Sequence, residues 1–330
     1  MNDSQSQGES TTAEAMVQDL LMRSKRSTVI LLVAILSSCA AAGCSVRKIA
    51  VKKLGDALAQ SGTTFASDND PELIKAALPF SLKLIESLLA ESPRHRGLLL
   101  AACSGFTQYA YAFVKQEADE TESKDFSAAM ALRTRARNLF LRARDYGLRA
   151  LEITHSGFTR ALNKDPSSAV RRTRADDVPL LYWTAASWGL AITLSKNEPA
   201  LIADQPMVEA LIDRALELNE SFDRGAIHSF LISYEPARQG AAEDFRERAR
   251  KHFERAMELS GGYQAGPLVA MAESVSIAKQ DKHEFQSLLE RALAVDVDAQ
   301  PEYRLANIIA QRRARWLLSR IDELFLSDEP

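Results

Sequence analysis

The sequence predicts an all-α protein: an α-solenoid of degenerate helix pairs with a long C-terminal helix that caps the stack. Apolar residues recur with helical spacing along most of the chain after residue 70. No alternating apolar run bounded by hairpin turns stands out, so strands are not expected. A helix-ending pattern also returns at Arg214, Arg255 and Arg291, which lie 41 and 36 residues apart. That spacing is typical of helix-pair repeats.

The first 43 residues have the order of a secretory signal. Arg23, Lys25 and Arg26 form a basic region, an apolar run covers residues 29–36, and small residues follow up to Cys44. The sequence AAGC at residues 41–44 indicates lipidation of Cys44, whereas LSSC at residues 36–39 makes Cys39 the rival site. A membrane or buried helix is the alternative, but the apolar run is short for a span.

These signals divide the chain into three parts. Residues 1–43 are a polar leader and signal that is removed, residues 44–70 are the lipid anchor and N-terminal segment, and residues 71–330 are the helical domain. Met22 is a better start for the signal than Met1, because residues 1–21 are polar and acidic. We expect a lipid-anchored periplasmic protein. Ser45 after the cysteine favours the outer membrane over the inner one.

Composition excludes several function classes. From residue 44 onward the chain has 38 basic and 40 acidic residues, so no general attraction to nucleic acid is expected. Removal of Cys39 and lipidation of Cys44 leave Cys103 as the one free thiol, in an apolar stretch that indicates a core position. Beyond the signal there is no long apolar run, so the acyl chains of the lipid are the expected membrane attachment.

The helical elements follow in order. A short helix over residues 45–59 ends at a break over residues 62–64, and residues 68–72 have the capping acid and proline of a helix start. Four helix pairs come next, with polar insertions at residues 117–124 and 163–177. Their small, aromatic first helices are residues 101–114, 180–194, 226–234 and 266–278, and their charged second helices are residues 135–153, 208–218, 244–259 and 284–295. Residues 301–326 predict one long capping helix. Its basic run at Arg312, Arg313 and Arg315 indicates a solvated face or a docking face.

The second helices resemble the tetratricopeptide repeat. Alanine, an aromatic residue such as Phe140 or Phe253, a further alanine and leucine recur at the positions of that repeat. The first-helix signature is degraded and the helix-ending proline is mostly missing, so these are cryptic repeats with long inserts. An irregular helical bundle is the alternative.

No catalytic or metal-binding constellation stands out. The five histidines, His95, His155, His228, His252 and His283, are not spaced with acids or thiols as metal ligands are. The chain has no phosphate-binding glycine loop and no nucleophile motif. We therefore expect a protein that is not an enzyme and has no cofactor, although a periplasmic hydrolase whose site assembles only in three dimensions stays open as an alternative.

The aromatic residues of the first helices are the better candidates for a ligand groove. In a tetratricopeptide array the first helices line the concave surface, and tyrosine and tryptophan combine apolar area with a polar group. Trp183 and Trp188 are five residues apart, so one is expected to pack while the other lines the groove. The candidate residues are Phe106, Tyr109, Tyr182, Trp183, Trp188, His228 and Tyr234.

Five stretches together with Cys44 resemble one family, the T component of TRAP (tripartite ATP-independent periplasmic) transporters. They are LGDALA at residues 54–59, SGTTFASD at 61–68, SGFTQYA at 104–110, LLYWTAASWG at 180–189 and RRARWLL at 312–318. The resemblance runs from about residue 44 to the C-terminus. Each motif is weak alone, but five in the same order are specific.

This resemblance implies a non-catalytic periplasmic lipoprotein of cryptic tetratricopeptide repeats. It implies a homotrimer that binds the periplasmic solute-binding protein of a TRAP system. It also implies a groove or pore in each protomer for a small hydrophobic or carboxylate ligand. A general periplasmic adaptor lipoprotein for outer-membrane or envelope assembly is the alternative from the same features.

We predict that Cys44→Ala leaves the protein without its lipid, because the thiol that receives the diacylglycerol is gone. Mass spectrometry of the mature N-terminus measures this directly. An acylated Cys39 in the unsubstituted protein would move the anchor to the rival site.

Overall fold

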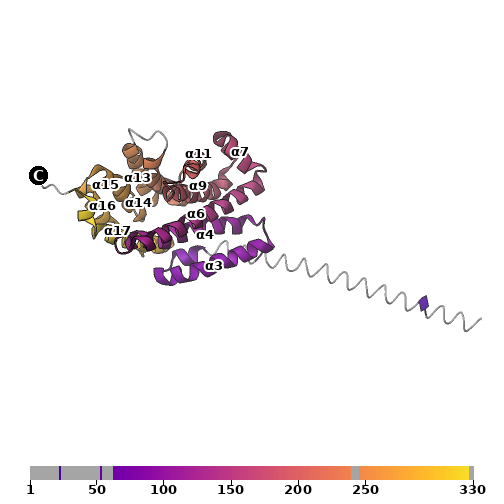
Figure 1. Ribbon diagram of the computed structural model, residues 1–330, viewed down its shortest axis with the longest axis horizontal. Helices are drawn as coiled ribbons and strands as arrows, with labels where there is room; N and C mark the ends of the chain where they lie inside the picture. Colours follow the sequence, from indigo (N-terminus) through magenta and orange to yellow (C-terminus); the bar gives the residue numbers. More distant parts are fainter. Residues whose placement is uncertain (1–21, 24–52, 54–61, 239–244, 327–330) are drawn as a thin grey trace, which may run out of the picture. The chain divides into compact units, whose positions relative to one another are not determined.

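The computed structural model describes residues 22–23, 53, 62–238 and 245–326 of the 330-residue chain. Residues 1–53 and 54–330 form two separate units, and the fold below is that of the second unit. Throughout its described part the chain is helical and has no strand, so the predicted all-α class is confirmed (Figure 1). Cys39 and Cys44 lie outside the described residues, so lipidation stays a prediction.

Of two helix boundaries predicted near the start of this unit, one is correct and one is wrong. The predicted break at residues 62–64 is wrong, because a short helix α2 covers Gly62–Ala66. The predicted start near residue 70 is confirmed, because α3 spans Pro71–Glu91. The Asp70 carboxylate accepts hydrogen bonds from the backbone N–H groups of Glu72 and Leu73. This cap satisfies two of the N–H groups that a helix start leaves unpaired.

The four predicted helix pairs are all present. Each first helix packs against its second helix, and neighbouring first helices α4, α9, α12 and α14 also contact one another in order. The first helices are α4 (Arg96–Tyr109) with η1 (Ala110–Lys115) and α5 (Gln116–Thr121), α9 (Val178–Thr193), α12 (Ala226–Tyr234), and α14 (Gly266–Met271) with η5 (Ala272–Ser276) and α15 (Ile277–Lys279). The second helices are α6 (Phe126–Thr154), α11 (Gln205–Leu218), α13 (Phe245–Ser260) and α16 (Lys282–Leu293). The solenoid and the tetratricopeptide assignment both stay predictions.

The polar insertions are more helical than expected. Much of residues 117–124 belongs to α5, which continues the first helix of the first pair. Residues 163–177 include α8 (Pro166–Val170) and η2 (Ala175–Asp177), and α7 (Phe158–Lys164) precedes them. The remaining connections contain α10 (Pro199–Ile202), η3 (Phe222–Arg224) and η4 (Glu235–Ala237).

The C-terminal region differs from the single long helix that the sequence predicted. It consists of η6 (Pro301–Tyr303), α17 (Arg304–Leu318) and α18 (Ile321–Leu324), because the helix ends at Ser319 and Arg320. Helix α17 covers α16 as a cap should, and it also contacts α14, α2 and α3. Helix α17, near the C-terminus, therefore contacts the N-terminal helices α2 and α3, so it does not leave the end of the array open to solvent (Figure 1).

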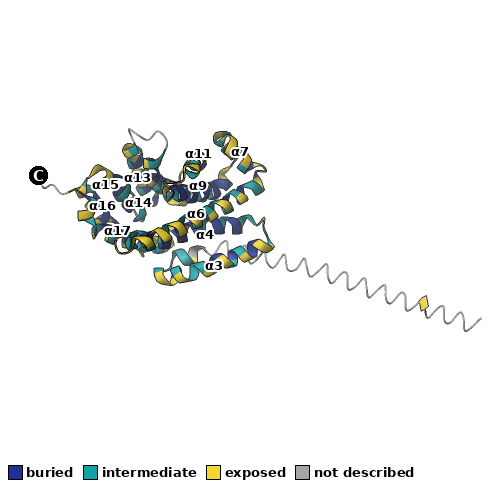
Figure 2. Cartoon of the chain, in the orientation of Figure 1, coloured by how far each residue is buried: buried dark blue, intermediate teal, exposed yellow. Residues whose placement is uncertain are grey.

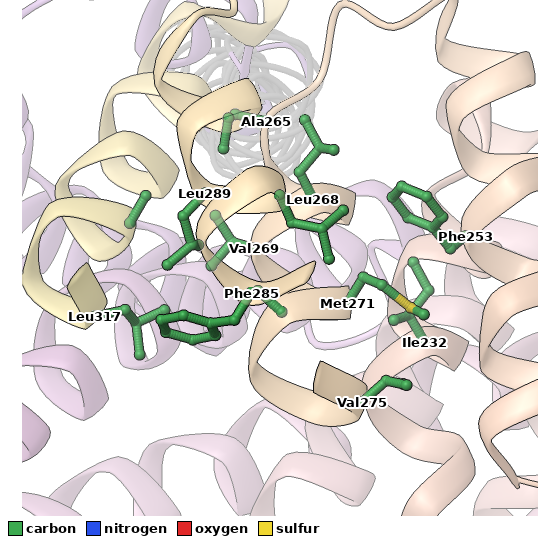
Figure 3. Packing of buried hydrophobic residues seen from close by; sticks show 14 of the residues in the cluster. Ile232, Phe253, Ala265, Leu268, Val269, Met271, Val275, Phe285, Leu289 and Leu317 are labelled. Atoms are coloured by element: carbon green, nitrogen blue, oxygen red, sulfur yellow. The ribbon is translucent and has the colours of Figure 1, made fainter. Parts of the chain in front are cut away.

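A continuous apolar core supports the last two pairs. Phe253 and Ile232 meet Met271, while Phe285 and Leu317 pack on the other side of α14 (Figure 3). Buried and exposed residues alternate along the outer helices, as one-sided packing requires (Figure 2). The core of the first pairs contains Leu98, Leu99, Phe140, Leu151 and Leu181, all inaccessible to solvent.

Among the described residues, one helix is long and apolar enough to span a membrane by length and composition, Arg96–Thr121. More than half of its most apolar window is buried, and its first part, α4, packs against α3, α6 and α9. Its apolar character is therefore explained by its place in the core.

Helices α4, α6 and α9 meet at Gly147 of α6. A Cβ atom at this position would overlap Thr184 Oγ1 of α9 and would lie 3.1 Å from Cys103 Sγ of α4. Cys103 is fully buried, and burial raises the pKa of its thiol to about 12, which confirms the predicted core position. Gly147 thus sets how closely three helices of the first two pairs approach one another.

We predict that Gly147→Ala lowers the free energy of unfolding by about 1–3 kcal/mol, because the added methyl group forces α6 away from α9. Urea denaturation followed by circular dichroism measures the loss. Gly266→Ala is the matched control, since a Cβ there meets nothing within 4 Å. Equal stability of the two variants would contradict the close approach.

Candidate functional site

The structure separates the seven candidate groove residues into two groups. Phe106, Tyr109, Trp188, His228 and Tyr234 are buried, with at most 7% of each residue exposed. Tyr182 and Trp183 are half-buried and stay partly accessible. As expected, Trp188 packs: its indole N–H donates to Asp204 Oδ2 at 3.1 Å.

The buried aromatic residues hold helices together. The Phe106 ring stacks on Tyr146 of α6 with ring centres 6.0 Å apart, and the Tyr146 hydroxyl donates to Glu86 of α3 at 2.7 Å. Arg135 of α6 donates to the Tyr109 hydroxyl at 3.2 Å. These contacts join α3, α4 and α6, so they position the first helices and do not face a ligand.

His228 belongs to a histidine pair. Its Nδ1 atom lies 2.8 Å from Nδ1 of His252, which links α12 to α13. Burial is the main cause that lowers the pKa of His228, and it lowers that of His252 to about 4. One ring must donate while the other accepts, so the contact requires at least one neutral imidazole. The described residues contain no group of three or more His, Cys, Asp or Glu that could hold a metal ion.

Tyr182 is the centre of an aromatic cluster that consists of Tyr182, Trp183, Phe222 and Phe230. The ring of Tyr182 lies 4.9 Å from Trp183, 5.4 Å from Phe222 and 6.4 Å from Phe230, measured between ring centres. These distances and tilted orientations are those of favourable aromatic pairs. All four residues keep part of their surface accessible. The cluster joins α9, η3 and α12, so it faces the space between consecutive first helices.

Tyr111 of η1 is accessible, with 44% of the residue exposed. Its ring lies 5.9 Å from the Lys115 ammonium, measured to the ring centre. The surrounding protein raises the pKa of its phenol, and the Glu273 carboxylate raises it further.

Tyr182 of α9 is electrostatically linked to its surroundings. Burial raises the pKa of Tyr182, and the charges of Asp223 and Tyr111 raise it further. The Tyr303 hydroxyl of η6 donates to Asp223 of η3 at 3.4 Å, so the C-terminal region contacts the turn that carries Phe222.

An ion cluster lies beside Tyr111, formed by the half-buried Lys115, Asp119 and Glu273 and the buried Arg313. The Arg313 guanidinium, with only 9% of the side chain exposed, lies 3.1 Å from Asp119 and 2.6 Å from Glu273. Lys115 lies 2.9 Å from Asp119. Burial raises the pKa of Asp119, but the positive charges of Lys115 and Arg313 outweigh it and hold this pKa below its usual value.

Two π-helical segments supply residues of this region. Tyr111 and Lys115 lie on η1, and Glu273 lies on η5, while both segments interrupt otherwise α-helical first helices. Such bulges are rare and occur often at functional sites, because they turn side chains away from their α-helical direction. Here they direct residues of the first and last pairs toward Arg313.

Sequence reasoning missed most of this region. It singled out Tyr182 and Trp183 but not Tyr111 as a site residue, and it assigned Arg313 to a solvated or docking face, which is wrong because Arg313 is buried. The four-residue spacing of Lys115 and Asp119 was a visible signal for a helical ion pair. Asp223 and Tyr303 lie 80 residues apart, and no local pattern joins them.

The fold and these side chains define a class: an all-helical protein of helix pairs with an accessible aromatic cluster and a cluster of ion pairs. The model of the TRAP transporter T-component matches residues 67–325, and the chain belongs to this family. It is similar to an uncharacterized protein of Treponema pallidum (strain Nichols), with 29% identity over 304 residues that cover 86% of this chain and 94% of the relative. The family is that of an accessory, generally non-catalytic component of a TRAP transporter.

We predict that Arg313→Ala lowers the free energy of unfolding by about 1.5–3 kcal/mol, because it removes the partner of the half-buried Glu273 and one of the partners of Asp119, which keeps Lys115. Arg312→Ala is the neighbouring control. Its pairs with Glu72 and Glu120, at 3.0 and 2.8 Å, are nearer the solvent, so we expect a loss below about 1 kcal/mol. Urea denaturation measures both, and equal losses would contradict the role of the ion cluster.

Proposed function

We propose that the protein is a lipid-anchored periplasmic component of a TRAP transport system that binds the solute-binding protein. As part of this proposal, it holds a small ligand in a hollow between its first helices, next to the aromatic cluster. Its family supports the transport role. The observation that carries ligand binding is the aromatic cluster, whose four rings stay partly accessible beside the ionisable groups of Tyr111 and Asp223.

The chemistry of the hollow suits a small ligand with an apolar body. Aromatic rings give large contact area at little cost in side-chain entropy, and the hydroxyls of Tyr111, Tyr182 and Tyr303 supply hydrogen bonds. A hydrophobic ligand, or one with a carboxylate near Lys115, is what the family resemblance implies. The charges of the ion cluster are already paired with one another. They would therefore orient a bound ligand more than they would attract it.

The same proposal includes a homotrimer anchored through Cys44. The trimer rests on the family resemblance. Phe80 and Phe126 are 73% and 64% exposed, but single exposed apolar residues do not by themselves mark a contact surface. We expect light scattering of the detergent-solubilised protein to give three times the mass of one chain. A monomeric mass would count against the trimer without affecting the transport role.

Capture of the solute-binding protein tests the central claim. The full lipidated chain carries an affinity tag in its native host, and a detergent extract is analysed by quantitative mass spectrometry. We expect the solute-binding protein of a TRAP system to be enriched at least tenfold over a tagged control lipoprotein of equal abundance, about 1.4 kcal/mol of preference.

The Cys44→Ala variant tests lipid anchoring and partner binding separately. This variant should leave the membrane fraction and still capture the solute-binding protein, because binding uses the folded domain. Envelope-assembly proteins in place of the solute-binding protein would favour the general adaptor instead.

A further inference from the structure

Exposed positive charge is concentrated at the end of α6 and in the segment that follows it. The whole chain has a formal net charge of −3. Between residues 149 and 177, however, the exposed charged residues are mostly basic, with Asp165 and Asp176 as the exposed acids. We call the exposed basic residues of this segment the basic surface. They are Arg149, Arg160, Lys164, Arg171, Arg172 and Arg174.

The packing of α6, α7 and α8 brings residues of the basic surface together. Helix α7 contacts both α6 and α8. The Arg172 guanidinium donates to the Ser156 carbonyl oxygen at 3.0 Å, in the turn between α6 and α7. Beside that turn, Arg149 and Arg160 line one open depression of about 460 Å³ together with Gly157. Arginines from three separate stretches of the chain therefore meet around the α6–α7 turn.

Most acidic side chains of this region are already bonded within the protein. Glu152 and Asp145 line the same depression. Glu152 accepts hydrogen bonds from backbone N–H groups at the start of α7, and Asp145 pairs with Arg144 at 2.8 Å. Asp165 caps the start of α8, and Asp177 is buried in an ion pair of its own. These carboxylates therefore do little to neutralise the basic surface.

The basic side chains, by contrast, have neutral partners. Arg171 donates to a serine hydroxyl at 2.7 Å, and Arg172 and Arg149 donate to backbone carbonyl oxygens. No carboxylate of the described residues forms an ion pair within 4 Å with these three arginines, or with Arg160 or Lys164. Hydrogen bonds to neutral groups hold the arginine side chains in place and leave their charge uncompensated.

The basic surface has no apolar centre. Among the described residues, the large exposed apolar side chains, such as Phe80 and Phe126, all lie outside residues 142–177. The centre of a protein interface is typically apolar and aromatic, with polar residues at its rim. An anionic membrane instead offers many phosphate groups to basic side chains. Positive charge without apolar neighbours therefore favours a phosphate-bearing surface over a protein partner.

We propose that the basic surface binds the headgroups of anionic phospholipids. The planar guanidinium of arginine donates two parallel hydrogen bonds to phosphate oxygens, and all but one of the residues of this surface are arginines. Each basic side chain close to an anionic membrane strengthens binding by roughly fivefold. Several uncompensated side chains together therefore give measurable binding at low ionic strength.

Headgroup binding goes beyond the proposed function, which attaches the protein to the membrane through lipid alone. The basic surface would determine which end of the helical unit faces the membrane. It does not replace the lipid, because physiological salt screens exposed charges over about 8 Å. The Cys44→Ala variant should therefore still leave the membrane fraction.

Sedimentation with lipid vesicles tests the proposal on the full-length Cys39→Ala/Cys44→Ala chain, which has neither candidate lipidation site. Vesicles of phosphatidylcholine are compared with vesicles of equimolar phosphatidylcholine and phosphatidylglycerol at low ionic strength. The neutral vesicles measure any insertion through the apolar run at residues 29–36, which every variant keeps. We expect roughly tenfold tighter binding to the mixed vesicles, and loss of this preference at high salt. Equal binding to both vesicles, or a preference that high salt does not weaken, would overturn the proposal.

The triple variant Arg160→Gln/Lys164→Gln/Arg171→Gln removes half of the basic surface. All three side chains are exposed, so the circular dichroism spectrum and the thermal midpoint should not change. We expect the affinity for the mixed vesicles to fall roughly tenfold or more. Unchanged affinity would refute the proposal, because basic residues elsewhere in the chain would then account for the binding. If this variant also lost capture of the solute-binding protein, the basic surface would be a protein contact instead.

The matched control is Lys196→Gln/Arg291→Gln/Arg315→Gln, which removes the same number of exposed positive charges from other parts of the chain. We expect its affinity for the mixed vesicles to fall less than about threefold, because only the net charge of the chain has changed. Equal losses in the two triple variants would show that net charge determines binding, and would contradict a localised surface.

Discussion

A buried guanidinium joins the two ends of the helical array. Arg313 brings a positive charge into the core of the last pair, and such a charge costs several kcal/mol unless it is paired. Asp119 from the first pair and Glu273 from the last pair both lie within 3.1 Å of it. The interaction therefore links segments that lie almost 200 residues apart in the chain, and α17 can leave this position only by exposing or orphaning three charges.

The proposed ligand site lies next to this closure. Tyr303 immediately precedes α17, and Lys115, which pairs with Asp119 of the ion cluster, lies 5.9 Å from the centre of the Tyr111 ring. The closing contact thus helps to position Tyr111 and Tyr303 as well as to stabilise the fold.

The helix pairs were predictable because each is encoded locally. Helical spacing, the Asp70 cap and the recurring helix ending act over a few residues, and the structure confirms the pairs they predicted. The closure was not predictable, because nothing within residues 301–326 shows that Arg313 meets carboxylates on two other helices. The candidate site was also only partly predictable. Tyr182 and Trp183 could be predicted because they belong to an aromatic first helix. Asp223 lies in a turn with left-handed residues, which one sequence does not reveal.

Two unusual backbone features lie in different parts of the array. The π-helical segments η1 and η5 carry Tyr111 and Glu273, and left-handed residues form η3. Neither feature is needed to stack helix pairs, since α9 and α11 pack without one. Irregular backbone occurs often at functional sites, and these two features flank the residues of the ligand site that we propose.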